Sequence, residues 1–183
     1  MRKDKGMVYI FCGNGKGKTS AALGVIVRML LSGKTVQWIS WFKEDSWKTA
    51  EMKLAKVFNK SLNMHWMGSG FFGGPRDHDT LDGHKKAAEK ALYLAKEILI
   101  KKEGVGGMTD LLVLDEVTKA IDDGLLNINE VIDVVKTRGK THLVLTGHDC
   151  PVELIKVADL VTEMKKIKHP YDKGILAVSG LDF

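Results

Sequence analysis

The chain has 183 residues, of which 44% are hydrophobic and 28% are charged, and its formal net charge is +5. These values fit one soluble globular domain over residues 1–183 and exclude a disordered or fibrous protein. The charge suits polyanionic small molecules as well as nucleic acid, but no basic aromatic groove is evident, so we expect no nucleic-acid partner.

Neither a signal-type apolar run nor a segment of membrane-spanning length is evident in the sequence. The two cysteines, Cys12 and Cys150, are far apart and form no CxxC pair, which argues against a disulfide framework. We therefore expect a cytoplasmic protein that does not bind membranes.

Short apolar segments alternate with helical patterns along the chain. In chain order, we expect a strand at 7–12, a helix at 18–31, strands at 35–41 and 62–67, a helix at 80–101, a strand at 110–115, a helix at 129–137, a strand at 141–146, and a helix at 151–157. The tail from residue 158 predicts two further strands around a basic turn. Strands this apolar are buried on both faces, which indicates a mainly parallel sheet flanked by helices, an α/β fold.

Residues 68–84 fit no regular element, because this segment contains five glycines and a proline. The paired Phe71 and Phe72 argue against disorder. Two interpretations are open: these rings anchor the segment to the core, or they contact a flat apolar ligand. Composition alone slightly favours the anchor.

The segment GNGKGKT, residues 13–19, predicts a phosphate-binding loop (P-loop) between a strand and a helix. Its glycines let backbone N–H groups surround phosphate oxygens, Lys18 can reach the outer phosphates, and the Thr19 hydroxyl is the usual magnesium ligand. The residues expected to bind the nucleotide are Gly13, Asn14, Gly15, Lys16, Gly17, Lys18, Thr19 and Ser20.

The opening glycine of the pattern G-x-x-x-x-G-K-[ST] is replaced by Cys12. A cysteine near a helix N-terminus can have a lowered pKa and be reactive. The alternative, a small buried thiol that packs under the loop, is the interpretation we favour. In either case the N–H donors of the loop remain.

The segment LLVLDE is an apolar strand that ends in Asp115 and Glu116, as expected for the magnesium side of a P-loop protein. Together with the loop, it predicts binding of ATP with Mg²⁺. The chemistry stays open at this point. Glu116 could polarise water in an ATPase, and a second substrate site would make the protein a kinase.

The ordered series GNGKGKT, LLVLDE, LVLTG, ADLVTEM and IKHPYDKGILAVSGLDF resembles the ATP:corrinoid adenosyltransferase family over residues 6–183. The resemblance implies a RecA-like P-loop fold and transfer of the 5′-deoxyadenosyl group of ATP to Co(I) of a corrinoid, cobalamin or cobinamide, with release of triphosphate. It also implies a homodimer and leaves room for a flavoprotein-type electron donor. The alternatives are a Mg-dependent ATPase or small-molecule kinase, and a non-catalytic nucleotide-dependent protein.

By this resemblance, Lys16 and Lys18 stabilise the leaving triphosphate, and no acid or base is required because Co(I) is itself a strong nucleophile. The family's magnesium-side acid corresponds to Glu116, and Arg28 matches an arginine that contacts ATP.

In the same family, an aromatic residue of a G-F segment presses on the lower face of the corrinoid and makes its cobalt easier to reduce. Phe71 matches that residue, which now favours the ligand contact over the core anchor, and its neighbour Phe72 is a second candidate for contact with the corrinoid. This sequence departs from the family at Gly73, where a tryptophan is frequent, and at His148, which stands where a ligand-contacting arginine is common and is therefore a candidate for that contact. The N-terminal arm that covers the corrinoid in some members is nearly absent.

Overall fold

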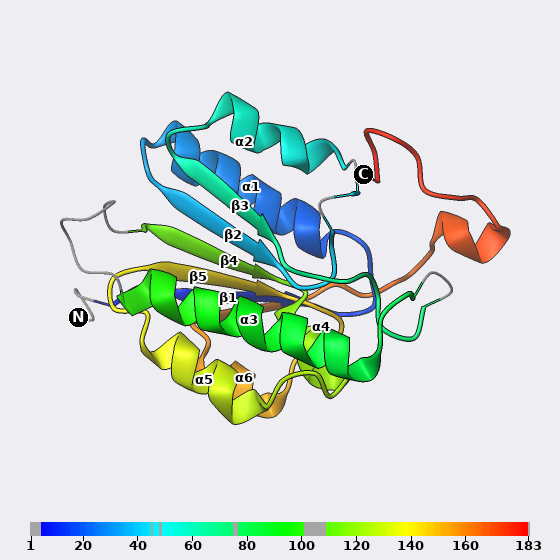
Figure 1. Cartoon of the computed structure of the whole chain (residues 1–183). Helices are drawn as coiled ribbons and strands as arrows, with labels where there is room; N and C mark the ends of the chain where they lie inside the picture. The colour runs from blue at the N-terminus through cyan, green and yellow to red at the C-terminus, as the bar shows by residue number, and fades with distance from the viewer. Residues whose placement is uncertain (1–4, 45, 48, 75–76, 101–108, 183) are drawn as a thin grey trace.

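The computed structural model describes residues 5–44, 46–47, 49–74, 77–100 and 109–182 (Figure 1). Its centre is a six-stranded sheet in the order β3-β2-β4-β5-β1-β6, in which every neighbouring pair is parallel. The strands are β1 (Val8–Cys12), β2 (Val36–Ser40), β3 (Leu62–Trp66), β4 (Leu111–Asp115), β5 (His142–Thr146) and β6 (Leu160–Glu163). The fold is the α/β, P-loop type that the sequence predicts.

Helices cover both faces of the sheet (Figure 1). The helix α1 (Lys18–Leu31) packs on one face through Ala22, Ile26 and Leu30. The long helix α3 (Leu81–Ile100) packs on the other face. The remaining helical elements are η1 (Ala50–Lys53), α2 (Leu54–Val57), α4 (Val117–Asp122), α5 (Ile128–Lys136), α6 (Val152–Val157) and η2 (Pro170–Lys173).

The central strands are buried because a side chain on either face meets a helix layer. All five residues of β4 are buried, and its neighbours β2 and β5 are buried apart from one half-buried and one exposed residue. This continuous burial explains why the sequence shows apolar runs where a half-exposed sheet would show alternation. No helix of the described residues is both long enough and apolar enough to span a bilayer.

The strands and helices predicted before the tail are confirmed, with boundaries that move by at most one residue. Position 101 of the expected helix lies outside the described residues. Of the two strands expected in the tail, the first is confirmed as β6 and the second is wrong, since the described tail continues after β6 only with the short helix η2. Ile175 and Leu176 have the apolar side chains of a strand, but both are exposed and pair with no strand.

Because all the strands are parallel, their carboxyl ends meet at one edge of the sheet. The P-loop follows β1, and Ser40 ends β2. Asp115 and Glu116 stand at the end of β4. Segments that are far apart in sequence are thereby brought together at this edge.

Candidate functional site

The P-loop is held in a conformation that requires glycine. Gly13 and Gly17 have φ angles of 106° and 117°, in the region that side chains disfavour. A Cβ on Gly13 or Gly15 would lie 2.4 or 2.7 Å from the carbonyl oxygen of Met164. The backbone of the segment after β6 therefore leaves room only for glycine at positions 13 and 15, whether or not a phosphate is bound.

Lys18 is buried and folds back over the loop. Its Nζ donates hydrogen bonds to the carbonyl oxygens of Gly13 at 2.8 Å and Gly15 at 3.0 Å. These bonds fix the curvature of the loop and hold the ammonium at its centre. Lys16 is more exposed and forms an ion pair with Asp182 of the tail.

Cys12 is a buried thiol at the end of β1. Burial raises the pKa of this thiol, although a hydrogen bond with the Cys150 side chain opposes the shift. Burial also raises the pKa of Cys150, to about 12. The geometry supports the packed-thiol interpretation, and it brings together two cysteines that the sequence separates widely.

Asp115 is fully buried and accepts hydrogen bonds through both of its carboxylate oxygens. Oδ1 accepts from the hydroxyls of Thr146 at 2.8 Å and Thr19 at 3.3 Å. Oδ2 accepts from the hydroxyl of Ser40 at 3.3 Å and lies 3.4 Å from Nζ of Lys43. The acid at the end of β4 is thus joined to the first helical turn after the P-loop.

Glu116 has a strained backbone, with a φ of 64°, and its N–H donates to the hydroxyl of Thr146 at 2.8 Å. Its buried Oε2 accepts no hydrogen bond from the described residues. Burial, followed by the nearby charge of Asp115, raises the pKa of Glu116 to about 7. A buried carboxylate oxygen without a partner suits a cation that arrives with the ligand.

These groups fit Mg²⁺ brought by a nucleotide. Among the described residues, no three His, Cys, Asp or Glu side chains gather into a group that could hold a metal ion. Mg²⁺ is commonly held by one or two protein oxygens together with phosphate oxygens and water. The Thr19 hydroxyl beside Asp115, with the unpaired oxygen of Glu116, offers such a partial ligand set.

A cavity of about 690 Å³ opens beside the P-loop helix. It combines hydroxyls of α1, the aromatic segment after β2, the glycine-rich segment and the tail. The lining residues are Thr19, Ser20, Leu23, Ser40, Phe42, Lys43, Trp47, Thr49, Glu51, Phe71, Glu116, Ala177 and Asp182. Of the predicted phosphate and magnesium residues, Thr19, Ser20 and Glu116 line the cavity, and it joins them to one of the two predicted aromatic residues.

Phe71 lines this cavity and Phe72 does not. The Phe71 ring stacks on Phe42 at a centroid distance of 5.3 Å, and Trp47 packs against it at 5.6 Å. Phe72 instead makes an edge contact with His84 at 5.4 Å and packs against the core below α3. The packing of Phe72 agrees with the core-anchor interpretation, and the corrinoid contacts predicted for Phe71 and Phe72 stay predictions.

Lys43 is a site residue that the sequence analysis missed. Its Nζ lies 2.7 Å from Oε1 of Glu51 and 3.4 Å from Oδ2 of Asp115, above the rings of Trp38 and Trp66 at 5.4 and 5.9 Å. Burial alone would lower the pKa of Lys43, but the charges of Asp115 and Glu51 outweigh it and raise that pKa.

Trp47, which also lines the cavity, was missed as well. Neither Lys43 nor Trp47 lies in a recognisable sequence motif.

Three predicted ligand-binding residues lie at the margin of the site or away from it. Arg28 is exposed in the last turn of α1, about 15 Å along the helix from Lys18. His148 is exposed, and its carbonyl oxygen accepts from the N–H of Gly13 at 2.6 Å. The side chain of Asn14 accepts from the N–H of Lys166 at 2.9 Å. The contacts of these three residues with a bound ligand stay predictions.

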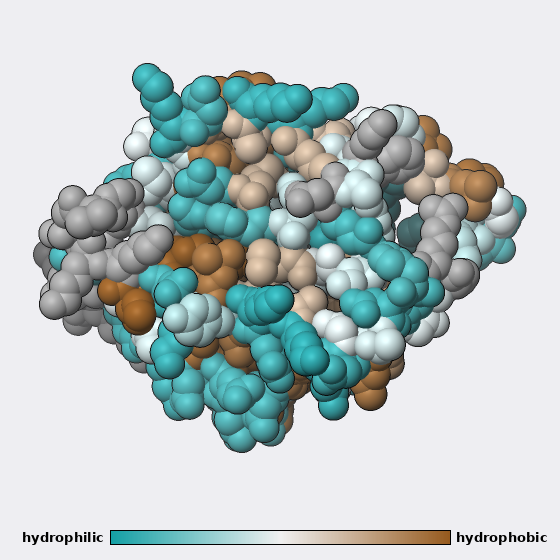
Figure 2. All heavy atoms as spheres, in the orientation of Figure 1, coloured by the Kyte–Doolittle hydropathy of each residue, from teal (hydrophilic) through white to brown (hydrophobic). Residues whose placement is uncertain are grey.

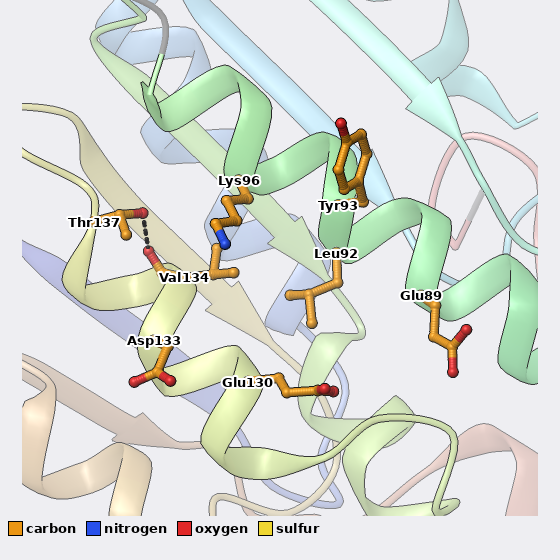
Figure 3. A pocket seen from close by; sticks show the side chains of 8 residues that line it. All are labelled: Glu89, Leu92, Tyr93, Lys96, Glu130, Asp133, Val134 and Thr137. Carbon is orange, nitrogen blue, oxygen red and sulfur yellow. Dashed lines mark hydrogen bonds between the residues drawn. The ribbon is translucent and has the colours of Figure 1, made fainter.

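A second cavity, of about 320 Å³, lies between α3 and α5 and is shown in Figure 3. Three carboxylates, of Glu89, Glu130 and Asp133, surround it together with the ammonium of Lys96. None of the motif residues lines it, and its excess of carboxylates disfavours a polyphosphate. The cavity beside the P-loop is therefore the candidate active site.

Comparison with known proteins agrees with this geometry. The profile of the family described as ATP:corrinoid adenosyltransferase BtuR/CobO/CobP matches residues 4–183. The chain is 35% identical over 183 residues to a corrinoid adenosyltransferase of a Sinorhizobium species, covering 98% of this chain and 81% of the relative. It is 34% identical to the Pseudomonas aeruginosa corrinoid adenosyltransferase, in a match that covers 100% of this chain and 86% of the relative. It is 30% identical to the corrinoid adenosyltransferase CobA of Salmonella typhimurium, in a match that covers 100% of this chain and 88% of the relative.

Proposed function

The chain belongs to the ATP:corrinoid adenosyltransferase family and transfers an adenosyl group from ATP to a corrinoid, and on this premise we propose that its two substrates meet in the cavity beside the P-loop. The observation that supports the proposal is the lining of this cavity. Thr19 and Ser20, which follow the phosphate loop, share it with the aromatic ring of Phe71. A reaction that joins a nucleotide to a flat macrocycle needs both surfaces within one space.

In the proposed reaction, the electron pair of the corrinoid's Co(I) attacks the 5′ carbon of ATP, and the bond from this carbon to the triphosphate oxygen breaks. Inorganic triphosphate leaves with the electrons of that bond. No proton is transferred in this step, so the protein contributes position, exclusion of water and stabilisation of the leaving charge. Lys18 and the remaining N–H groups of the P-loop would supply that stabilisation, since those of Gly13 and Gly15 donate to the carbonyls of His148 and Met164, and Lys16 would add a second cation at the rim.

Mg²⁺ is part of this proposal. Thr19, Asp115 and Glu116 would hold it together with phosphate oxygens, and when bound it would neutralise charge on the leaving triphosphate. Asp115 orients the Thr19 hydroxyl through their hydrogen bond at 3.3 Å.

Phe71 is proposed to contact the lower face of the corrinoid. Phe71 is 42% exposed and lines the cavity, and one face of its ring is supported by buried Phe42. A ring in this position can displace an axial ligand from the cobalt and so make Co(II) easier to reduce. Phe72 supports the segment from the core side.

The remaining expectations concern assembly and supply of electrons. A homodimer and a flavoprotein-type electron donor are proposed from the family resemblance, and a cytoplasmic location is proposed because the two widely separated cysteines fit a reducing compartment. Exposed apolar side chains in the tail, among them Ile167, Leu176 and Leu181, offer a surface that a second copy could cover, and Figure 2 shows hydrophobic atoms on the surface of the tail at the right of the molecule.

One incubation tests the proposed function. The purified protein is mixed with ATP, Mg²⁺ and chemically reduced cobalamin, the corrinoid is followed by absorbance, and phosphate products are separated by ion exchange. We expect adenosylcobalamin and triphosphate in equal amounts. Release of orthophosphate from ATP without any corrinoid would instead identify an ATPase.

A further inference from the structure

The strongest unassigned feature of the site is the ammonium of Lys43. Lys43 follows the end of β2 by three residues, and Ser40 of β2 is the register partner of Asp115 in β4. This pairing brings the segment after β2 close to the acid of the P-loop site. The Lys43 side chain is mostly buried, at 14% exposed, and reaches the wall of the cavity.

Lys43 is fixed from several sides. Glu51 of η1 holds its Nζ at 2.7 Å, and the rings of Trp38 and Trp66 lie below it at 5.4 and 5.9 Å. A lysine held by a carboxylate and two indole rings has little of the rotational freedom of a surface lysine. Its position is therefore set by the fold before any ligand binds.

Asp115 needs a cation at this position. A fully buried carboxylate is costly unless it is paired and hydrogen-bonded. Thr146, Thr19 and Ser40 supply hydroxyl donors, but hydroxyls rotate and carry no net charge. Within the part of the chain that the structure describes, Lys43 is the cationic side chain within 4 Å of this carboxylate.

We propose that Lys43 is a positioning residue of the nucleotide site: held by Glu51, it fixes one oxygen of Asp115 so that the other faces the Thr19 hydroxyl. This inference rests on the proposed function, because Thr19 and Asp115 are assigned there to Mg²⁺. Without the ammonium, Asp115 loses its fixed orientation, and nucleotide binding has to restore it. Lys43 thus acts on the Mg²⁺ complex of ATP through Asp115, without touching the phosphates.

A direct contact between Lys43 and the triphosphate is the competing possibility, and metal dependence separates the two. A lysine that touches phosphate strengthens binding of ATP whether or not Mg²⁺ is present. A lysine that acts through Asp115 and Thr19 affects mainly the Mg²⁺-dependent part of binding. Affinity with and without the metal therefore distinguishes the roles.

The experiment is isothermal titration calorimetry of ATP binding to the wild type and to Lys43→Met, in Mg²⁺ and in EDTA. We expect binding in Mg²⁺ to weaken by about 10- to 100-fold, the usual loss when a residue that supports a metal ligand is removed. Binding in EDTA should be unchanged. Lys43→Arg, which keeps the charge, should recover part of the loss, and the KM for the corrinoid should stay the same.

Two further variants serve as checks. Lys53→Met removes an exposed lysine of η1 and should bind ATP as the wild type does in both buffers. Glu51→Gln keeps Lys43 but removes the negative charge of its anchor, so it should show a smaller loss of the same kind, even if Lys43→Met folds poorly.

An equal loss in Mg²⁺ and EDTA would overturn the proposal in favour of phosphate contact. Unchanged or tighter binding of ATP in Mg²⁺ would also overturn it. Because these titrations contain no corrinoid, they give a result even if the proposed adenosyl transfer fails.

Discussion

The ring of Phe71 stacks on the ring of Phe42, with centroids 5.3 Å apart and planes inclined by 15°. Phe42 is buried in the core, and Phe71 is partly exposed at the cavity. One face of Phe71 is therefore supported, while the ring still presents surface to a ligand.

If Phe71 contacts the corrinoid to make Co(II) reducible, its removal should matter only while reduction is needed. Phe71→Ala should strongly slow product formation from Co(II) cobalamin with a weak reductant. It should be much less impaired with chemically generated Co(I). The melting temperature should fall only slightly, because a fully buried phenylalanine cut to alanine costs about 3–5 kcal/mol and this ring is partly exposed. Equal losses from both oxidation states, with a large fall in melting temperature, would make Phe71 a packing residue.

Lys18 is expected to be essential for turnover. Lys18→Ala removes both the central cation and the two hydrogen bonds that curve the loop around Gly13 and Gly15. We expect kcat/KM for ATP to fall by at least about 100-fold, as when a donor to a developing oxyanion is removed. Far-UV circular dichroism should stay unchanged, and Lys16→Ala, at a more exposed position, should lose less activity. Normal turnover of Lys18→Ala would show that this loop does not bind the reacting nucleotide.

Glu116 should make the metal-free protein less stable as the pH rises. Its carboxyl has an ordinary pKa of 4.5, and burial followed by the charge of Asp115 raises the folded-state pKa to about 7, against the opposing charges of Lys18, Lys43 and Lys119. Between these values the folded protein retains a proton that the unfolded chain has released. The free energy of unfolding therefore falls from about pH 4.5 to about pH 7, by roughly 3 kcal/mol for this group.

Glu116→Gln has no proton to release, so it should match the wild type near pH 4.5 and be more stable above pH 7. Urea unfolding in EDTA at several pH values measures the difference, and comparison of the two proteins cancels the other titrating groups. If the free energy of unfolding changed with pH in the same way for the wild type and for Glu116→Gln, the burial of an ionisable Glu116 would be contradicted.

The thiols of Cys12 and Cys150 are expected to be inert in the folded protein. Iodoacetamide reacts with thiolates, and burial raises the pKa of Cys12 and raises that of Cys150 to about 12. Intact-protein mass spectrometry after treatment near pH 7.5 should show little alkylation until guanidinium is added. Cys12→Ala and Cys150→Ala assign any modification to its site. Fast alkylation of Cys12 in native buffer would restore the reactive-thiol interpretation.

The sheet was predictable because its signals are local. The residues of β4 and β5 form apolar runs that belong between two helix layers, and the P-loop glycines mark the turn from β1 to α1. The second strand expected in the tail was wrong because it also rested on a local signal. The apolar run at residues 175–178 predicts a strand, but a strand forms only where a neighbouring strand pairs with it, and these residues form none.

The site was predictable only as far as its motifs reach. Lys43 belongs to it because β2 pairs with β4, and Trp47 because its segment meets Phe71. Both contacts depend on how distant segments pack, and no local pattern encodes them. Phe71 and Phe72 are adjacent and identical in type, so only the backbone of the segment decides which one faces the cavity.

The strand β1 lies between β5 and β6, so both of its neighbours come from much later in the chain. The N–H of Gly15 then donates to the carbonyl of Met164, and Lys16 pairs with Asp182. On a translating ribosome, the nucleotide loop therefore emerges long before the segments that surround it. Pairing across such separations is slow, and the growing chain exposes both edges of β1 in the meantime. A nascent chain that stops before residue 160 would carry the complete nucleotide motif without a finished site, and it would be a substrate for chaperones before it could become an enzyme.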